Sequence, residues 1–309
     1  MVVKCSYFIQ DNFSMVITEL TGGLGNQLFQ YASSKALALH QNTELILDIS
    51  SFYREELPEL EVPRDFEMNH FSGVTEKVIT SKDYETNETY KGFTVSNLEK
   101  LLPRHKRKVY KEPHFHFDKN FFSSRKNVLL KGVWQSEKYF AKYQSQVRKI
   151  LVPKEEMISR VKQKGNELKQ QNSVSIHVRR GDYLRLPIIL EWHGVLDIEH
   201  YDNAIKLLHS KADQPLILYY FSDDPKWVET NLCSLWPGEV VSKNSQNTGM
   251  EDFYLMSQCR HNIIANSSFS WWAAWLNNNP EKVVIAPKKW FGNAPNNTID
   301  LIPESWIKI

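Results

Sequence analysis

The sequence is poor in cysteine, has no long apolar run and carries no large excess of either charge. Its 309 residues include three cysteines, Cys5, Cys233 and Cys259, so a disulfide framework is not expected. We expect a reducing, cytoplasmic environment instead. The longest apolar run, 216–221, is six residues, against the ~20 residues that span a membrane. A net charge of +2 argues against a nucleic-acid partner, which needs a clustered excess of cations.

Metal-binding motifs are also missing. The sequence contains no D-x-D, H-E-x-x-H or C-x-x-C pattern, and its one acidic pair at a predicted strand end, Asp223-Asp224, is adjacent rather than spaced. Residues 1–14 lack the long apolar centre of a signal peptide and fit no element. The sequence leaves open whether they belong to the native protein, and it says nothing of oligomeric state.

The residues present, 41% hydrophobic and 12% aromatic, are sufficient for a large core. Residues 15–20 predict a strand, a glycine turn and a helical stretch follow, and 44–50 predict a second strand. A charged, amphipathic helix or linker covers 154–172. Beyond it, further strands are expected at 174–178, 216–221, 239–241, 261–265 and 282–286, with helices at 200–210, 225–232, 250–258 and 269–277.

This alternation predicts an α/β protein with parallel sheets. We place a domain boundary near residue 166, which gives an N-terminal α/β domain, 1–166, and a C-terminal Rossmann-like domain, 167–309, with a cleft between them. Residues 50–125 show few clean periods. Within them, the segment 100–111, KLLPRHKRKVYK, holds six Lys or Arg and no acid. It is either a solvated face or a contact for an anionic membrane surface or a phosphate-bearing acceptor.

The glycine turn, residues 21–27, TGGLGNQ, has two interpretations. Gly23 and Gly25 follow a strand and open a helix, and Asp48 ends the next strand, as in dinucleotide-binding folds, but the third glycine is replaced by Leu28. The alternative is a tight turn. At its helix start, backbone amides and the Asn26 and Gln27 side chains would hold a phosphate or a sugar hydroxyl.

Two arginines follow the buried strand 174–178. Period two places His177 and Arg179 on one side of the strand and Arg180 on the other. Ligands of open α/β sheets bind beyond the carboxyl ends of strands, so one arginine is expected to reach an anion. The other would pair with a carboxylate such as Asp182. A purely structural Arg–Asp pair is the alternative.

The sequence resembles a family at three places. HVRRGDY, 177–183, resembles the H-x-R-R-x-D signature of fucosyltransferases that make α1,2, α1,6 and O-linked protein fucose. TGGLGNQLFQYA and EDFYLMSQCRHNIIANSSFSWWAAWL resemble the N- and C-terminal motifs of the α1,2-fucosyltransferases, and the resemblance covers 15–290. The length is similar to that of the bacterial members. The resemblance implies a GT-B fold of two facing Rossmann-like domains, GDP-fucose as donor, inversion, and no required metal or other cofactor.

The resemblance also assigns residues. Without a metal, Arg179 is expected to stabilise charge on the leaving β-phosphate. The expected catalytic set is Arg179, Asn26, His177 and Asp182. The expected donor-binding set is Gly23, Gly25, Asn26, Gln27, His177, Arg179, Ser222, Asp223, Asn266, Ser267, Ser268 and Ser270.

The acceptor side is less defined. Tyr183, Glu191, Trp192 and Asp197 are the acceptor candidates, since aromatic rings stack on sugar faces. The base that would deprotonate the acceptor is left open among Asp182, Glu191, Asp197 and Asp202. The alternative is a dissociative transition state without a strong base, in which the leaving phosphate takes the proton.

The expected function is transfer of L-fucose from GDP-β-L-fucose to the 2-hydroxyl of a galactose in a glycan acceptor. The enzyme would be cytoplasmic, and segment 100–111 would bring it to the inner face of the cytoplasmic membrane or to a lipid-linked acceptor. Two alternatives stand beside it. One is a nucleotide-dependent oxidoreductase, suggested by Gly23, Gly25 and Asp48; the other is a non-catalytic carbohydrate-binding protein, suggested by the nine tryptophans.

Overall fold

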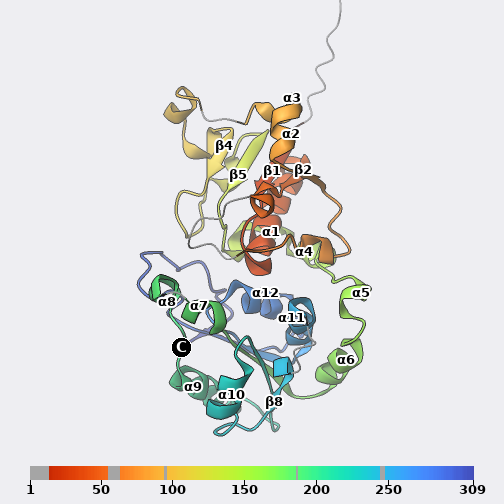
Figure 1. Cartoon of the computed structure of the whole chain (residues 1–309), viewed down its shortest axis with the longest axis vertical. Helices are drawn as coiled ribbons and strands as arrows, with labels where there is room; N and C mark the ends of the chain where they lie inside the picture. The colour runs from red at the N-terminus through yellow and green to blue at the C-terminus, as the bar shows by residue number, and fades with distance from the viewer. Residues whose placement is uncertain (1–13, 55–62, 94–95, 186, 244–247) are drawn as a thin grey trace, which may run out of the picture.

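Two parallel β-sheets, one from each half of the chain, form the two ends of an elongated molecule (Figure 1). The computed structural model describes residues 14–54, 63–93, 96–185, 187–243 and 248–309. In the first half, strand order is β3-β2-β1-β5-β4, and every neighbouring pair is parallel. In the second half it is β11-β10-β9-β6-β7-β8, again all parallel.

The first half contains strands β1 (Met15–Glu19), β2 (Glu44–Asp48), β3 (Lys77–Ile79), β4 (Val109–Lys111) and β5 (Val128–Lys131). Its helices are α1 (Leu24–Gln41), α2 (Ser81–Thr86), α3 (Glu88–Lys91) and α4 (Gln144–Ile150). Short 3-10 turns fill the connections: η1 (Ser50–Tyr53), η2 (Met68–His70), η3 (Glu99–Leu101), η4 (Arg104–Lys106), η5 (Phe121–Ser123), η6 (Glu137–Tyr139) and η7 (Ala141–Tyr143).

The second half contains strands β6 (Ser173–Val178), β7 (Ile217–Ser222), β8 (Glu239–Val240), β9 (His261–Ile263), β10 (Val284–Ala286) and β11 (Ile307–Lys308). Its helices are α5 (Glu155–Ile158), α6 (Lys162–Gln170), α7 (Gly181–Arg185), α8 (Pro187–His193), α9 (Ile198–His209), α10 (Pro225–Asn231), α11 (Gly249–Gln258) and α12 (Ser268–Leu276), with the turn η8 (Val241–Lys243).

The α/β alternation predicted beyond residue 166 is confirmed, with the ends of the predicted elements displaced by at most two residues. The predicted helix at 154–172 is two helices, α5 and α6. Sequence reasoning missed β3, β4 and β5, which are three or four residues long and too short for a clear period of two. The division at residue 166 stays a prediction; it falls inside α6, which packs against α11 of the second half.

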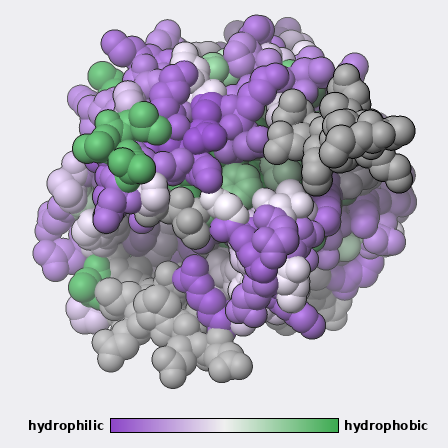
Figure 2. All heavy atoms as spheres, turned by 90° about the horizontal axis from the view of Figure 1, so that it is seen from above, coloured by the Kyte–Doolittle hydropathy of each residue, from purple (hydrophilic) through white to green (hydrophobic). Residues whose placement is uncertain are grey.

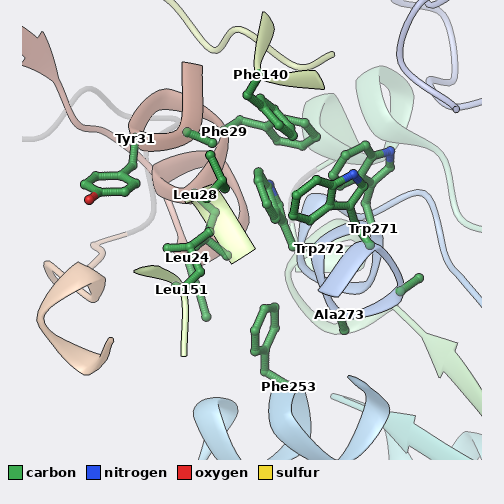
Figure 3. Close-up of a cluster of buried hydrophobic side chains, with 14 of the residues drawn as sticks. Leu24, Leu28, Phe29, Tyr31, Phe140, Leu151, Phe253, Trp271, Trp272 and Ala273 are labelled. Atoms are coloured by element: carbon green, nitrogen blue, oxygen red, sulfur yellow. The ribbon is translucent and has the colours of Figure 1, made fainter. Parts of the chain in front are cut away.

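The two halves share one aromatic core. Phe29 of α1 lies 4.4 Å, between ring centroids, from Trp271 of α12, and Phe140 stacks on Trp272 at 5.2 Å (Figure 3). All four side chains are fully buried. Apolar burial stabilises by about 25 cal/mol per Å², so these large rings contribute strongly to holding the halves together.

The starts of α1 and α12 touch each other. A Cβ built on Gly25 would lie 2.4 Å from the Ser268 carbonyl carbon and 2.5 Å from the Phe269 amide nitrogen. Only a glycine at this position lets the two helix backbones approach so closely. The glycine therefore serves helix packing, not the dinucleotide fingerprint that the turn first suggested, and Leu28, in place of the third glycine, is fully buried.

This contact predicts the effect of Gly25→Ala. The added methyl meets backbone on the opposing helix, which cannot rotate away as a side chain could, so we expect a loss of about 1–3 kcal/mol in the free energy of unfolding. Urea unfolding followed by tryptophan fluorescence measures it. Gly92→Ala is the matched control, because its Cβ would meet nothing closer than the Lys108 Nζ at 4.0 Å. A Gly25→Ala midpoint equal to the control would contradict the packing role.

Candidate active site

A cleft of about 1140 Å³ lies at the carboxyl ends of strands from both sheets. Its lining residues follow β1, β2, β4 and β5 in the first sheet and β6, β7, β9 and β10 in the second. In the first sheet, β2 and β3 lie on one side of β1, and β4 and β5 lie on the other. In the second sheet, β7 and β8 lie on one side of β6, and β9, β10 and β11 lie on the other. The direction of strand order therefore reverses at β1 and at β6. Such reversal points form ligand crevices in open α/β sheets. Both lead into the cleft: β1 through the glycine turn and β6 through Arg179.

The starts of α1 and α12 line the cleft side by side. Gly23 and Ser267, the residues that precede the two helices, make no side-chain cap hydrogen bond. Asn26 links them, since its Oδ1 accepts from Ser268 Oγ at 3.0 Å and from Gln135 Nε2 at 2.8 Å. The two helix dipoles thus point their positive ends at the same part of the cleft, which favours negative groups there; the Leu24 amide of α1 already donates to the Glu67 carboxylate.

Arg179 and Arg180 have different partners, as the strand period predicted. Arg179 Nη1 lies 2.9 Å from Asp223 Oδ2 and lines the cleft. Arg180 turns away: its Nε lies 3.3 Å from Asp224 Oδ2 and its guanidinium lies 4.0 Å from the Trp227 ring. Asp224 is therefore a carboxylate that pairs with Arg180, and Arg179 is the one of the two arginines that lines the cleft.

Asp223 and Asp224, the acidic pair after β7, have different partners. Asp224 caps α10 by accepting from the Trp227 amide at 3.1 Å. Asp223 accepts from the Arg180 amide at 2.9 Å and holds Arg179. A nucleotide contact of Asp223, expected from the sequence, stays a prediction; in this structure its oxygens orient the arginine.

His177 is a buried neutral imidazole at the edge of the cleft. Burial, together with the charge of Arg179, lowers its pKa to about 3, and Asp223 only partly opposes this. Its ring packs on Phe269 at 5.7 Å between centroids, and its Nδ1 has no hydrogen-bond partner. Such a group is uncharged at neutral pH, so it cannot supply a cationic charge to a ligand; it offers shape and one hydrogen bond.

Most of the residues predicted from sequence line this one cleft. They are Gly23, Gly25, Asn26, His177, Arg179, Tyr183, Trp192, Ser222, Asp223, Asn266, Ser267 and Ser268. Their convergence is an outcome of folding, because they come from segments more than 200 residues apart in the chain. Whether each contacts a donor or an acceptor stays a prediction.

Gln27 and Ser270 lie behind the cleft surface rather than on it. Gln27 is fully buried; its Nε2 donates to the carbonyls of Gly22 and Asp65, and its Oε1 accepts from the Glu67 amide. Ser270 is buried as well and donates to the Ser267 carbonyl. Because their polar groups are used within the protein, both support the wall of the site instead of touching a ligand.

Glu191 and Asp197, two of the acceptor candidates, are not among the lining residues. Asp197 caps α9 by accepting from the His200 amide at 2.9 Å, and Glu191 is exposed. Asp202, a candidate base, lies 2.6 Å from Lys206 Nζ and accepts from Trp236 Nε1. The side chain of Asp182, the remaining candidate, lies outside the described residues.

Two aromatic candidates do face the cleft. Trp192 is 47% exposed, so its ring surface is open to a sugar. Tyr183 is less available, because His193 stacks on it at 4.7 Å and its hydroxyl donates to the Asn266 carbonyl. Asn266 itself donates to three carbonyls, those of His193, Gly194 and Trp290, and so holds the loops around the cleft.

Sequence reasoning missed the wall contributed by residues 51–135 of the first half. That wall includes Ser51, Phe52, Arg54, Pro63, Arg64, Glu67, Glu112, His114, Phe115, Val133 and Gln135. These residues lie in loops that follow short strands, so no periodic signal marks them. Two of them are carboxylates: burial raises the pKa of Glu67 and raises that of Glu112 to about 7.

Among the described residues, no group of three or more His, Cys, Asp or Glu side chains is arranged to hold a metal ion. The cations that line the cleft are arginines: Arg54, Arg64 and Arg179. Together with the two helix starts, they make one part of the cleft suited to a di-anionic group such as a diphosphate.

Known proteins are similar to this chain along nearly its whole length. An Escherichia coli α-1,2-colitosyltransferase is 31% identical over 308 residues, covering 96% of this chain and 99% of the relative. The O-antigen biosynthesis glycosyltransferase WbnK of Escherichia coli is 31% identical over 304 residues, covering 94% and 99%. A galactoside 2-α-L-fucosyltransferase, SEC1 of Bos taurus, is 35% identical over 105 residues, which is 33% of this chain and 28% of that protein.

The fold agrees with these relatives. A structure of Arabidopsis thaliana FUT1 in complex with GDP superposes with a TM-score of 0.52 at 14% identity, over 95% of this chain and 76% of that one. The GT-B arrangement expected from the sequence is confirmed. The profile of Glycosyl transferase family 11 matches residues 74–309. The chain therefore belongs to Glycosyl transferase family 11.

Proposed function

We propose that this glycosyltransferase moves L-fucose, with inversion at the anomeric carbon, from GDP-β-L-fucose to the 2-hydroxyl of a galactose in a glycan acceptor. The observation that carries the proposal is that Arg179 and the starts of α1 and α12 line one cleft. The relatives add the linkage, since a colitosyltransferase and a fucosyltransferase among them are named for α1,2 or 2-α transfer.

The proposed transfer has two parts, departure of the GDP leaving group and attack by the acceptor hydroxyl. The bond from C1 of the sugar to the β-phosphate oxygen breaks, and its electron pair leaves with GDP. Arg179 and the helix-start amides stabilise the negative charge that grows on that oxygen. On the opposite face of C1, the acceptor oxygen forms the new bond and gives up its proton, which converts a β-linked donor into an α-linked product.

Colitose is the second candidate for the transferred sugar, because the α-1,2-colitosyltransferase matches 96% of the chain. Colitose lacks the 3-hydroxyl that fucose carries. A site that hydrogen-bonds a hydroxyl discriminates strongly against an analogue without it, whereas an apolar site discriminates weakly. The ratio of kcat/KM for the two GDP-sugars therefore identifies the natural donor.

The two alternatives from the sequence do not survive. An oxidoreductase is replaced by membership of a glycosyltransferase family. The tryptophans that suggested a carbohydrate-binding protein are mostly core: Trp134, Trp271, Trp272, Trp275, Trp290 and Trp306 are buried.

The proposal is tested by incubating the protein with lactose and either GDP-fucose or GDP-colitose, with and without EDTA. We expect an α1,2-linked trisaccharide from at least one donor, with undiminished rate in EDTA. Absence of transfer to every galactoside from both donors would contradict the proposal. Loss of activity in EDTA, restored by a divalent cation, would contradict metal independence alone.

Arg179→Ala tests the leaving-group role. Because one preorganised donor to the developing charge is removed, we expect kcat to fall by about 10²–10³-fold while the thermal midpoint changes little. Arg260→Ala is the control: that arginine is exposed and pairs with Glu281 on the surface at 2.7 Å. Near-normal turnover of Arg179→Ala would remove the arginine from the mechanism.

We also propose that segment 100–111 contacts an anionic membrane surface. No helix among the described residues is long and apolar enough to cross a bilayer. Leu98 and Leu101 are 78% and 82% exposed beside this basic segment. Seen from the end of the molecule that carries β4, apolar atoms gather at one edge of a mostly hydrophilic face (Figure 2). Exposed leucines among lysines and arginines suit the interface of an anionic bilayer.

The basic side chains differ in their use as probes. Lys106 donates to the Ser123 carbonyl and Arg107 to those of Leu102 and Lys100, so reversing their charge would also disturb the loop. In Lys100→Glu combined with Leu101→Ser, the side-chain bond removed is the exposed one from Lys100 Nζ to Asn97 Oδ1 at 3.0 Å, and the side-chain bonds to loop carbonyls stay. We expect the double variant to lose co-sedimentation with phosphatidylglycerol vesicles, whereas the exposed control Leu235→Ser keeps it. Unchanged sedimentation of the double variant would leave the segment a solvated face.

A further inference from the structure

Glu112 lines the cleft from the first half of the chain, whereas Arg179 lines it from the second half. Glu112 follows β4 directly, and β5 is the neighbouring strand, so the ends of both strands meet at this point. Its two carboxylate oxygens accept from successive backbone amides after β5: Oε2 from Val133 at 2.7 Å and Oε1 from Trp134 at 3.1 Å. The carboxylate is therefore held at both oxygens while its side chain lines the cleft.

The backbone that presents these amides is strained. Trp134 has φ of +50°, a left-handed conformation that bulky side chains rarely adopt and that costs about 1–3 kcal/mol. Full burial of the indole keeps it in place. Gly132, two residues before Trp134, leaves room for the Glu112 side chain, because a Cβ on Gly132 would lie 2.4 Å from the Glu112 Cβ. Successive amides turned toward one anion form a concave binding site, and here the anion is the Glu112 carboxylate.

The same turn is connected to the anion-binding side of the cleft. Gln135, the next residue, donates to Asn26 Oδ1, and that oxygen also accepts from Ser268 Oγ. A continuous run of contacts thus joins the Glu112 turn to the start of α1 and then to the start of α12. Glu112 is positioned relative to the place where a donor diphosphate would lie, not on an independent loop.

The other described carboxylates of the cleft have different surroundings. Asp223 is paired with Arg179, and Asp252 accepts from the Ser242 hydroxyl at 2.7 Å. Glu67 accepts from the Leu24 amide at the start of α1 and lies near the charge of Arg64, so it is held by a helix start and a cation. Glu112 belongs to the first-half wall and is held by neutral amides alone.

We propose that Glu112 is the general base that takes the proton from the acceptor hydroxyl. The inference rests on the proposed transfer to a sugar hydroxyl. As the acceptor oxygen bonds to C1 of the donor sugar, its proton moves to a Glu112 oxygen, and the electron pair of the breaking C1–O bond leaves with GDP. The carboxylate regains its charge when the proton passes to solvent after product release.

The electrostatics agree with this role. Burial raises the pKa of the Glu112 carboxyl to about 7, and the two amides only partly oppose the rise. A base works best when its pKa is near the working pH. The titratable groups on the surrounding elements are Lys111 on β4, Lys131 on β5, Tyr110 and Tyr139 in the core, and His114 in the cleft; Lys131 pairs with Glu19 at 2.9 Å.

The pH dependence follows with a definite sign. The base is active when it is deprotonated, so kcat/KM of the wild type should fall as pH drops through about 7. In Glu112→Gln this acidic limb should disappear, and kcat should fall by about 10²–10⁴-fold, the range for a lost general base. GDP affinity by calorimetry should be unchanged, which also shows that the variant is folded.

The rate of sugar transfer to azide distinguishes a general base from a residue that only supports the structure. Azide is an anionic nucleophile with no proton to remove, so Glu112→Ala should transfer the sugar from the GDP-sugar to azide at least as fast as the wild type. Glu112→Asp, a shorter carboxylate, should recover part of the transfer to lactose. Glu137→Gln is the matched control: burial raises the pKa of that carboxyl too, but it accepts from Trp275 Nε1 and is not among the cleft residues.

The outcomes separate the two proposals. If the wild type transfers no sugar from either GDP-sugar, the proposed function fails before Glu112 is tested. If the wild type is active and Glu112→Gln keeps near-normal kcat with the acidic limb in place, the base is another group and the transferase function stands. Loss of the limb in Glu67→Gln instead would assign the role to Glu67 and overturn this inference.

Discussion

The contact between the starts of α1 and α12 is the constraint on which the rest of the site depends. Gly25 allows the backbones to touch, Asn26 joins them by hydrogen bonds, and Phe29 with Trp271 seals the core behind them. Because α1 follows β1 of the first sheet and α12 follows β9 of the second, this contact joins the carboxyl-end edges of the two sheets. A methyl group at one position would disturb both packing and the anion-binding end of the cleft.

The cleft contains groups of both charge signs. Arg179 and the starts of α1 and α12 line it, and so does Glu112, whose carboxylate is held by two neutral amides. Sugar transfer from a nucleoside diphosphate to a hydroxyl uses groups of both kinds, since negative charge grows on the leaving phosphate while a proton leaves the acceptor. His177, though adjacent to the arginine, is neutral, so Arg179 is the charged member of that strand end.

Sequence reasoning succeeded where the signal is local and failed where it is not. Strands and helices of the second half were predicted because apolar runs and helical patterns alternate regularly along it. The first-half wall was missed because residues 50–125 are polar with few clean periods, and Glu112 stands in that polar context. Gln27, Ser270 and Asp197 were assigned to ligands, yet their polar groups are used by nearby backbone, a choice that depends on neighbours brought by folding.

The sequence by itself determined the α/β alternation, the glycine turn, the arginine strand end and the family to which the chain belongs. Each of these is recognised from the order of residues along the chain, without knowledge of which segments meet in space. Tertiary structure alone decided which acid pairs with each arginine and that Glu112 shares a cleft with Arg179. Those outcomes depend on contacts between segments far apart in the chain, such as Asn26 with Ser268, and no local pattern encodes such distances.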